Sequence, residues 1–156
     1  RLEQIKVGQE FIALVDYAHT PDAVARVLEI ANKLTKGKVI AVLGCGGDRD
    51  ISKRPLMGQA LFVGSDKAIF TSDNPRSESA NEILKAMVAG IDLAEKGFVI
   101  KDRRAAIDFA VEQASVGDFV LVLGKGHESG QEVNGITTPF DDRIELADSI
   151  KRVLKK

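Results

Sequence analysis

Lys38–Leu43 (KVIAVL) and Asp118–Leu123 (DFVLVL) are the two stretches that decide the fold. Each is a short and almost continuously apolar run rich in β-branched residues, which is typical of a strand covered on both faces of a sheet. Phe11–Asp16 (FIALVD) and Lys67–Thr71 (KAIFT) have the same character. These runs therefore predict the central strands of a mostly parallel sheet.

Helical patterns separate the apolar runs. Thr20 is the predicted N-cap of a helix with Pro21 at its first position, and Gly37 is predicted to end that helix. Further helices are expected over 55–63, from the Ser79–Glu82 capping box to about Ala89, from Asp102 to Ala114 and from Asp141 to about Leu154. A short strand at 99–100 and a hairpin over 131–138, turning at Asn134-Gly135, complete the pattern. The alternation predicts a Rossmann-like α/β domain with about six strands and helices on both faces.

The composition is that of one ordinary domain. The chain has 156 residues, 44% hydrophobic and 29% charged, and its net charge of -1 argues against a nucleic-acid-binding surface. No apolar run reaches the roughly 18–20 residues of a membrane span, and there is no signal-peptide pattern. Cys45 is the single cysteine, so a reducing cytoplasm is the expected compartment. Because the chain begins at Arg1, we interpret it as a fragment of a longer protein, with a processed domain that works alone as the alternative.

Four unusual loops follow the predicted strands. They are rich in acids, bases and glycines, and they span 16–21 (DYAHTP), 44–50 (GCGGDRD), 72–76 (SDNPR) and 124–128 (GKGHE). In an open α/β sheet, ligands bind beyond the carboxyl ends of the strands, where these loops are expected to meet. Arg49 and Arg76 can each hold a carboxylate through two hydrogen bonds, and Glu128 can accept hydrogen bonds from an ammonium group. The loops therefore predict a site for a small zwitterionic or anionic ligand.

Several familiar kinds of site do not fit these loops. The 44–47 segment lacks the third glycine of the dinucleotide fingerprint, because position 49 is arginine. Lys125 lies in a glycine loop without the P-loop frame, so the sequence contains no complete phosphate cradle for ATP. The two histidines lack metal-ligand spacing, and we predict no metal site. Purely structural interpretations stay open for a tight turn at 44–47 and for an Asn-Pro turn at 73–76.

The loop sequences resemble the Mur ligase family. The resemblance rests on segments that occur in family order along nearly the whole chain: 16–22 (DYAHTPD), 44–50 (GCGGDRD), 53–58 (KRPLMG), 71–76 (TSDNPR), 124–128 (GKGHE) and 139–143 (PFDDR). Each segment alone is weak evidence for the family, and together the segments are specific evidence for it. The resemblance implies that residues 1–156 are the C-terminal, amino-acid-binding domain, and that the N-terminal UDP-sugar domain and the central ATP P-loop domain are absent from this chain.

Within the family, the chain is most similar to the members that add meso-diaminopimelate to UDP-N-acetylmuramoyl-L-Ala-D-Glu during peptidoglycan precursor synthesis. The resemblance implies a cytoplasmic, ATP-dependent amide-bond ligase that works through an acyl phosphate. It also implies ATP and Mg²⁺ as cofactors held mainly by the absent central domain, the UDP-linked dipeptide held by the other domains, a monomeric state, and no nucleic-acid or membrane partner. The isolated domain is expected to be inactive and to hold no catalytic residue of its own.

The resemblance also assigns residues to ligands. The meso-diaminopimelate pocket is expected to contain Arg49, Asp73, Asn74, Pro75, Arg76, Gly124 and Glu128. Arg1, Asp16 and His19 are expected to contact ATP when the domain closes over it, although His19 is equally well explained as a hydrogen-bonded loop residue. Two other functions stay open. One is a lysine-adding sister ligase, against which the Asp73–Arg76 motif argues, and the other is a standalone binding module of the same fold.

Overall fold

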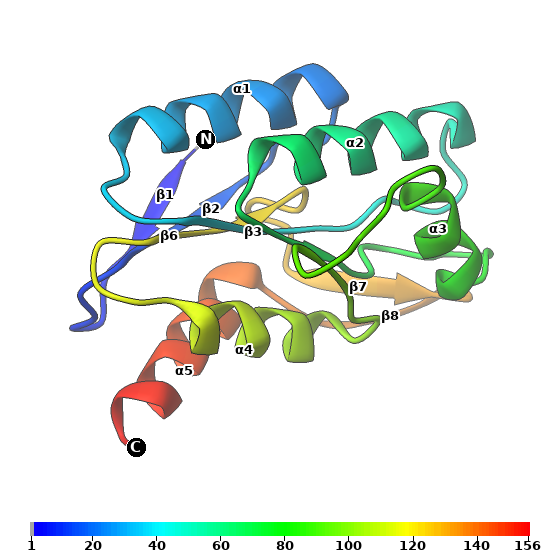
Figure 1. The fold of residues 1–156 in the computed structure, drawn as a ribbon. Coiled ribbons are helices and arrows are strands. Elements are labelled where there is room, and N and C mark those ends of the chain that lie inside the picture. The colour runs from blue at the N-terminus through cyan, green and yellow to red at the C-terminus, as the bar shows by residue number, and fades with distance from the viewer. Residues whose placement is uncertain (1) are drawn as a thin grey trace.

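A six-stranded sheet runs through the middle of the computed structural model, which describes residues 2–156 (Figure 1). Its strands are β1 (Glu3–Ile5), β2 (Ile12–Asp16), β3 (Val39–Leu43), β4 (Lys67–Phe70), β5 (Gly97–Val99) and β6 (Phe119–Leu123). Their order across the sheet is β1-β2-β6-β3-β4-β5, and every neighbouring pair is parallel except β1 with β2. The predicted mostly parallel sheet of about six strands is confirmed.

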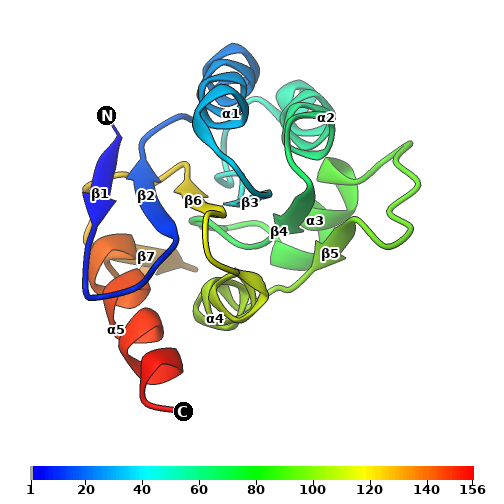
Figure 2. The same cartoon turned by 60° about the vertical axis from the view of Figure 1, so that its left-hand side comes forward.

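Helices cover both faces of this sheet, as predicted (Figure 2). One face carries α1 (Pro21–Leu34), α2 (Arg54–Gly64) and α3 (Ala80–Met87), and the other carries α4 (Arg103–Gln113) and α5 (Asp142–Leu154). Alternate residues of β3 belong to opposite cores: Ala41 packs with α1 and α2, whereas Ile40 and Val42 pack with α4. Because both faces are covered, every residue of β3 and β6 is buried, which explains their continuously apolar sequences.

The predicted helix starts are confirmed, but some helix ends differ. Thr20, Ser79, Asp102 and Asp141 each accept a backbone N–H in the first turn of the helix that follows. The end predicted at Gly37 is wrong: α1 stops at Leu34, because Thr35 turns to an extended conformation and donates its hydroxyl to the Gly117 carbonyl at 3.0 Å. Helix α3 likewise stops at Met87 rather than near Ala89.

The predicted hairpin forms as β7 (Gly130–Val133) and β8 (Ile136–Pro139). Asn134 (φ 50°) and Gly135 (φ 78°) both lie in the left-handed region that a two-residue hairpin turn requires. The hairpin is attached beside the end of the sheet, because β7 pairs with the loop that follows β4. Strand β1 and a 3-10 turn at Ile51–Lys53 were not predicted. Within residues 2–156, no helix has the length and apolar character needed to cross a membrane.

Candidate functional site

Four loops meet at the edge where the parallel strands end, as the sequence predicts. They follow β2, β3, β4 and β6 and span residues 17–20, 44–50, 71–79 and 124–129. Together they surround a cavity of about 360 Å³. Acidic and basic side chains both line this cavity, which suits a small ligand that carries charges of both signs.

The cavity brings together most of the residues predicted for an amino-acid pocket. Those in its lining are Arg49, Asp73, Asn74, Arg76, Gly124 and Glu128. Pro75 is not in the lining; it is buried behind it, where its carbonyl oxygen lies against Gly47. The loop after β4 therefore places three side chains at the cavity, and its proline supports them from behind.

The residues predicted to contact ATP are only partly described. Arg1 lies outside the described residues. Asp16 is buried at the end of β2, where its Oδ2 accepts the Ala18 N–H at 2.8 Å. His19 is exposed at the cavity, with Nδ1 3.0 Å from the Tyr17 carbonyl oxygen and its ring tilted against the Tyr17 ring. This position is compatible with both interpretations of His19, a loop contact and a ligand contact.

The loops after β3 and β4 are held together closely. The Gly47 N–H donates to the Asn74 carbonyl oxygen at 2.7 Å. A Cβ atom on Gly47 would lie 1.8 Å from the Pro75 carbonyl oxygen, so glycine is needed for this approach. The Ser77 N–H also donates to Oδ2 of Asp48 at 3.3 Å. This side of the cavity is therefore one structural unit made of two loops.

A buried arginine strengthens the same unit. Arg54 donates from Nη1 and Nη2 to the two carboxylate oxygens of Glu78, at 3.0 and 2.7 Å. Glu78 also accepts the Asp48 N–H at 2.6 Å. The Arg54 hydrogen bond, followed by that from Asp48, lowers the pKa of Glu78 to about 2, so this carboxylate stays ionised around neutral pH. Arg54 reaches the Gly46 carbonyl as well, and it adds positive charge to the cavity lining.

Arg76 is held from two sides. Its backbone has φ 53°, in the left-handed region that residues with side chains rarely adopt. Hydrogen bonds to the β7–β8 hairpin fix that conformation, because the Arg76 N–H donates to the Glu132 carbonyl and the Asn134 N–H donates to the Arg76 carbonyl. The guanidinium donates from Nη1 to the Gly47 carbonyl at 2.9 Å, and its Nε lies 3.5 Å from the Glu132 carboxylate. The direction of the guanidinium is thus set before any ligand arrives.

Two carboxylates supply the acidic part of the site. Asp73 is almost completely buried, and Glu128 is partly exposed; both line the cavity. Burial raises the pKa of the Asp73 carboxyl above its ordinary value, and the positive charges of Arg103 and Lys125 oppose that rise. Lys125 Nζ lies 3.9 Å from the Asp73 carboxylate and 3.3 Å from that of Glu128. The acidic part of the cavity therefore has an internal lysine as its nearest counter-charge.

A buried ion pair lies beneath the loops after β4 and β6. Arg103 donates from Nε and Nη2 to the two carboxylate oxygens of Asp142, at 2.9 and 2.6 Å, and both side chains are fully buried. The same guanidinium donates to the carbonyl oxygens of Ser72, at 2.9 Å, and Leu123, at 3.1 Å. Each of these carbonyls belongs to the residue just before one that lines the cavity. One side chain therefore fixes the separation of the two loops.

Sequence reasoning missed several of these supporting residues. From the sequence alone, Lys125 resembles at most a phosphate ligand, Glu132 belongs to a hairpin and Arg103 belongs to a helix. Arg54 lies in the family-like 53–58 segment, which was a signal for it. Partners such as Glu78 and Asp142 are separated from their arginines by 24 and 39 positions, so no local pattern reveals them.

Cys45 lines the cavity, yet its side chain is only 9% exposed. Burial, with the nearby Asp73 charge, raises the pKa of this thiol to about 12. Because the thiolate is the reactive form, we expect Ellman's reagent to label the native chain at pH 8 at least about a thousandfold more slowly than free cysteine. Guanidinium chloride should restore rapid labelling of one thiol, which is the control. Fast labelling of the native chain would contradict this environment.

Comparison with known proteins identifies the family. Residues 1–126 match the family described as Mur ligase, glutamate ligase domain. The chain belongs to the Mur ligase family. It is 52% identical to the UDP-N-acetylmuramoyl-L-alanyl-D-glutamate–2,6-diaminopimelate ligase of Streptomyces coelicolor, over 97% of this chain and 31% of that protein. It is 47% identical to the ligase of the same name from Geobacillus thermodenitrificans, again over 97% of this chain and 31% of that protein.

The fold of this Mur ligase domain is shared with a solved relative. A structure of a UDP-N-acetylmuramoyl-L-alanyl-D-glutamate–2,6-diaminopimelate ligase superposes with a TM-score of 0.93 and 46% identity, covering 99% of this chain and 32% of that chain. The chain thus spans about a third of the length of the relatives it matches. The predicted α/β architecture and family membership are confirmed, whereas the ligand roles of individual residues stay predictions.

Proposed function

We propose that this chain is the amino-acid-binding domain of a ligase that adds meso-diaminopimelate to UDP-N-acetylmuramoyl-L-Ala-D-Glu in peptidoglycan precursor synthesis. The observation that carries the proposal is the cavity, whose lining combines the guanidinium groups of Arg49 and Arg76 with the carboxylates of Asp73 and Glu128. Diaminopimelate has an ammonium and a carboxylate at each end, so it matches a lining that carries both charges. The names of the relatives support the same substrate.

In this proposal the domain binds and orients the incoming amino acid. Arg76, assisted by Arg49 and Asn74, holds the carboxylate that distinguishes diaminopimelate from lysine, and Glu128 holds the neighbouring ammonium group. The binding of these charges fixes the other end of the ligand, so that its amine points toward the activated peptide carboxylate. Gly124 (φ 108°) provides the turn that brings its loop to the cavity. The domain therefore contributes positioning, and the activation of the carboxylate takes place in the rest of the ligase.

ATP and Mg²⁺ belong, in this proposal, mainly to the central domain of the longer protein. The 124–128 glycine loop does not offer its lysine to a phosphate, because Lys125 is fully buried with its amine on protein oxygens. Among residues 2–156, no three acidic, histidine or cysteine side chains gather as a metal site requires. Asp16 and His19 are proposed to meet the nucleotide from this side when the domains close. We further propose a cytoplasmic, monomeric enzyme.

Calorimetric titration of the chain tests this proposal directly. We expect binding of meso-diaminopimelate, binding of L-lysine that is at least about 30-fold weaker, and little or no binding of ATP. The reason is that lysine lacks the second carboxylate and leaves the Arg76 guanidinium unmatched, while the nucleotide is proposed to bind mainly to the central domain of the ligase. Equal or tighter binding of lysine would favour a lysine-adding sister ligase. Tight binding of ATP by the chain alone would favour a standalone nucleotide-binding module.

A further inference from the structure

Lys125 is a fully buried lysine whose amine is used entirely inside the protein. Its Nζ donates to the Gly130 carbonyl at 2.7 Å, to Oδ1 of Asn74 at 3.2 Å and to Oε1 of Glu128 at 3.3 Å. An ammonium group has three N–H donors, so these three acceptors satisfy it. Lys125 is therefore not available to bind a phosphate, although a lysine in a glycine loop suggests such a role.

The amine determines how Asn74 faces the cavity. Oδ1 of Asn74 accepts from Lys125 and also from the Glu132 N–H at 3.0 Å, so its oxygen is occupied by two donors. The amide nitrogen is thereby turned toward Glu128, to which it donates at 3.3 Å. Asn74 can then present to a ligand only the N–H donor side of its amide. A donor at this place suits a carboxylate oxygen of the ligand and not an ammonium group.

Lys125 is shared by two acidic side chains of the cavity. Two carboxylates, those of Asp73 and Glu128, lie within 3.9 Å of the single Lys125 ammonium group. The nearby Arg103 is already matched by Asp142, with which it forms a bidentate pair. Both Asp73 and Glu128 line the cavity, so the single Lys125 ammonium group is shared by two carboxyl groups at the cavity wall. The Glu128 carboxylate is the more exposed of the two, so it is available to a ligand ammonium group.

We propose that Lys125 is a positioning residue of the amino-acid pocket: it orients Asn74 and Glu128 and offsets the charge of the carboxylates at the cavity floor, so that Asn74 receives a ligand carboxylate and Glu128 a ligand ammonium group. This inference rests on the proposed function, because it concerns the same amino-acid pocket. Without the lysine, the carboxyl groups of Asp73 and Glu128 lose their shared cation, and the Asn74 amide loses one of the two donors that fix it. Affinity for the amino acid then falls, while the affinities for the other substrates change little.

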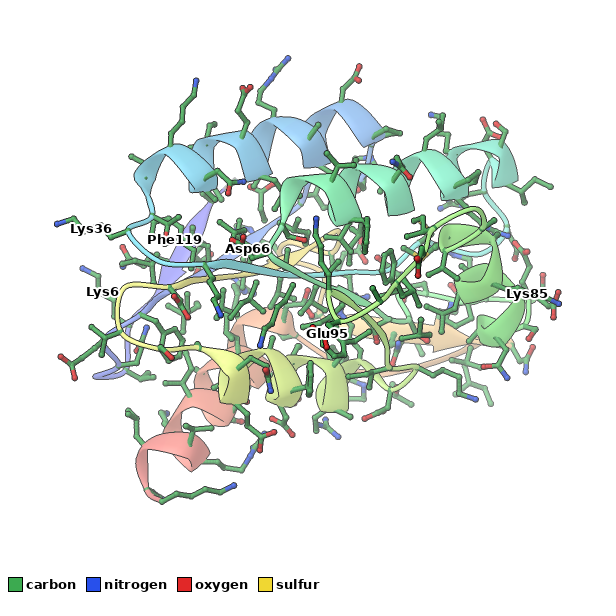
Figure 3. The ribbon with its side chains drawn as sticks, in the orientation of Figure 1. Lys6, Lys36, Asp66, Lys85, Glu95 and Phe119 are labelled. Atoms are coloured by element: carbon green, nitrogen blue, oxygen red, sulfur yellow. The ribbon has the colours of Figure 1, made fainter. Side chains whose placement is uncertain are left out.

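The experiment uses a full-length ligase that carries this domain, with the variants Lys125→Met and Lys125→Gln. Methionine removes both the charge and the hydrogen bonds at similar length, whereas glutamine removes the charge and keeps a donor. Lys36→Met is the matched control, because Lys36 is exposed in the loop before β3, at the opposite end of the sheet, and projects away from it (Figure 3). Steady-state kinetics gives KM for meso-diaminopimelate, ATP and the UDP-linked dipeptide, together with kcat.

We expect Lys125→Met to raise KM for meso-diaminopimelate at least about tenfold, with the two other KM values within about twofold and kcat changed less than KM. Lys125→Gln should lie between Lys125→Met and the unaltered enzyme, and Lys36→Met should match the unaltered enzyme. An unchanged KM for diaminopimelate, or equal changes for all three substrates, would overturn the inference. So would the failure of both Lys125 variants to fold, because the lysine would then support the fold rather than the pocket. If the unaltered ligase does not use meso-diaminopimelate, it is the proposed function that fails.

Discussion

Replacing Arg76 by alanine in a full-length ligase that carries this domain is expected to lower kcat/KM for meso-diaminopimelate by about 30-fold to several thousand-fold. The range corresponds to roughly 2–5 kcal/mol, the effect of truncating one partner of a desolvated charge pair. The guanidinium is held by the Gly47 carbonyl and by the Glu132 carboxylate, so it meets a ligand carboxylate without first losing much conformational freedom. Parallel assays with diaminopimelate and lysine measure the effect.

Two comparisons separate recognition from support of the loop. Arg76→Lys keeps the positive charge but loses the planar pair of donors, so it should recover only part of the activity. Alanine or lysine at position 76 must adopt the same left-handed backbone conformation as arginine. The conformational cost of that φ angle is therefore similar in both variants. Use of lysine as substrate should change little in either variant. Equal losses for both substrates, or undiminished use of diaminopimelate, would show that Arg76 only shapes its turn through Glu132 and Gly47.

Replacing Arg103 by methionine is expected to destabilise the domain by about 3–5 kcal/mol, which is the largest effect on stability that the structure suggests. Methionine leaves the fully buried Asp142 carboxylate without its counter-charge and deprives two carbonyl oxygens, on Ser72 and Leu123, of their donor. Urea unfolding followed by circular dichroism measures the change, with the midpoint and the slope fitted separately.

The neighbouring residue gives a matched control. Arg104 also forms an ion pair, with Glu145, but about half of the Arg104 side chain is exposed. Arg104→Met should therefore cost no more than about 1 kcal/mol. The double variant Arg103→Met with Asp142→Leu should be more stable than Arg103→Met alone, because no buried charge is left over. A loss below about 1 kcal/mol for Arg103→Met would mean that water reaches Asp142 and that the pair is not buried in solution.

The parts of the fold that sequence predicts are those with a strong local pattern. β3 and β6 are predictable because burial on both faces demands five consecutive apolar residues, and the helix starts are predictable because a cap needs one particular type of side chain. β1 has no such signal: of its three residues only Ile5 is buried, and its strand conformation comes from antiparallel pairing with β2. The end of α1 also depends on a distant partner, the Gly117 carbonyl.

The same distinction applies to the site. Because the carboxyl ends of parallel strands share one edge, the meeting of the four loops follows from the strand pattern alone. The buried supports do not follow from it. Arg103 and Asp142 each stand one position after a predicted N-cap, where an acid at a helix start is ordinary and an arginine is electrostatically unfavourable. Only the fold shows that the two side chains meet, and that the hairpin encloses Lys125 by bringing the Gly130 carbonyl to its amine.

The close approach of Gly47 to Pro75 has a consequence for transplanting substrate preference between related ligases. The segment 72–79 cannot be exchanged by itself, because its backbone fits only a partner loop that has glycine at position 47 and an aspartate at 48. Arg54 extends the same dependence into α2 through Glu78. The smallest set of residues that can be transferred is therefore discontinuous in sequence, because it comprises 44–54 together with 72–79. It must also include Glu132 of the hairpin, which helps to fix the direction of the Arg76 guanidinium.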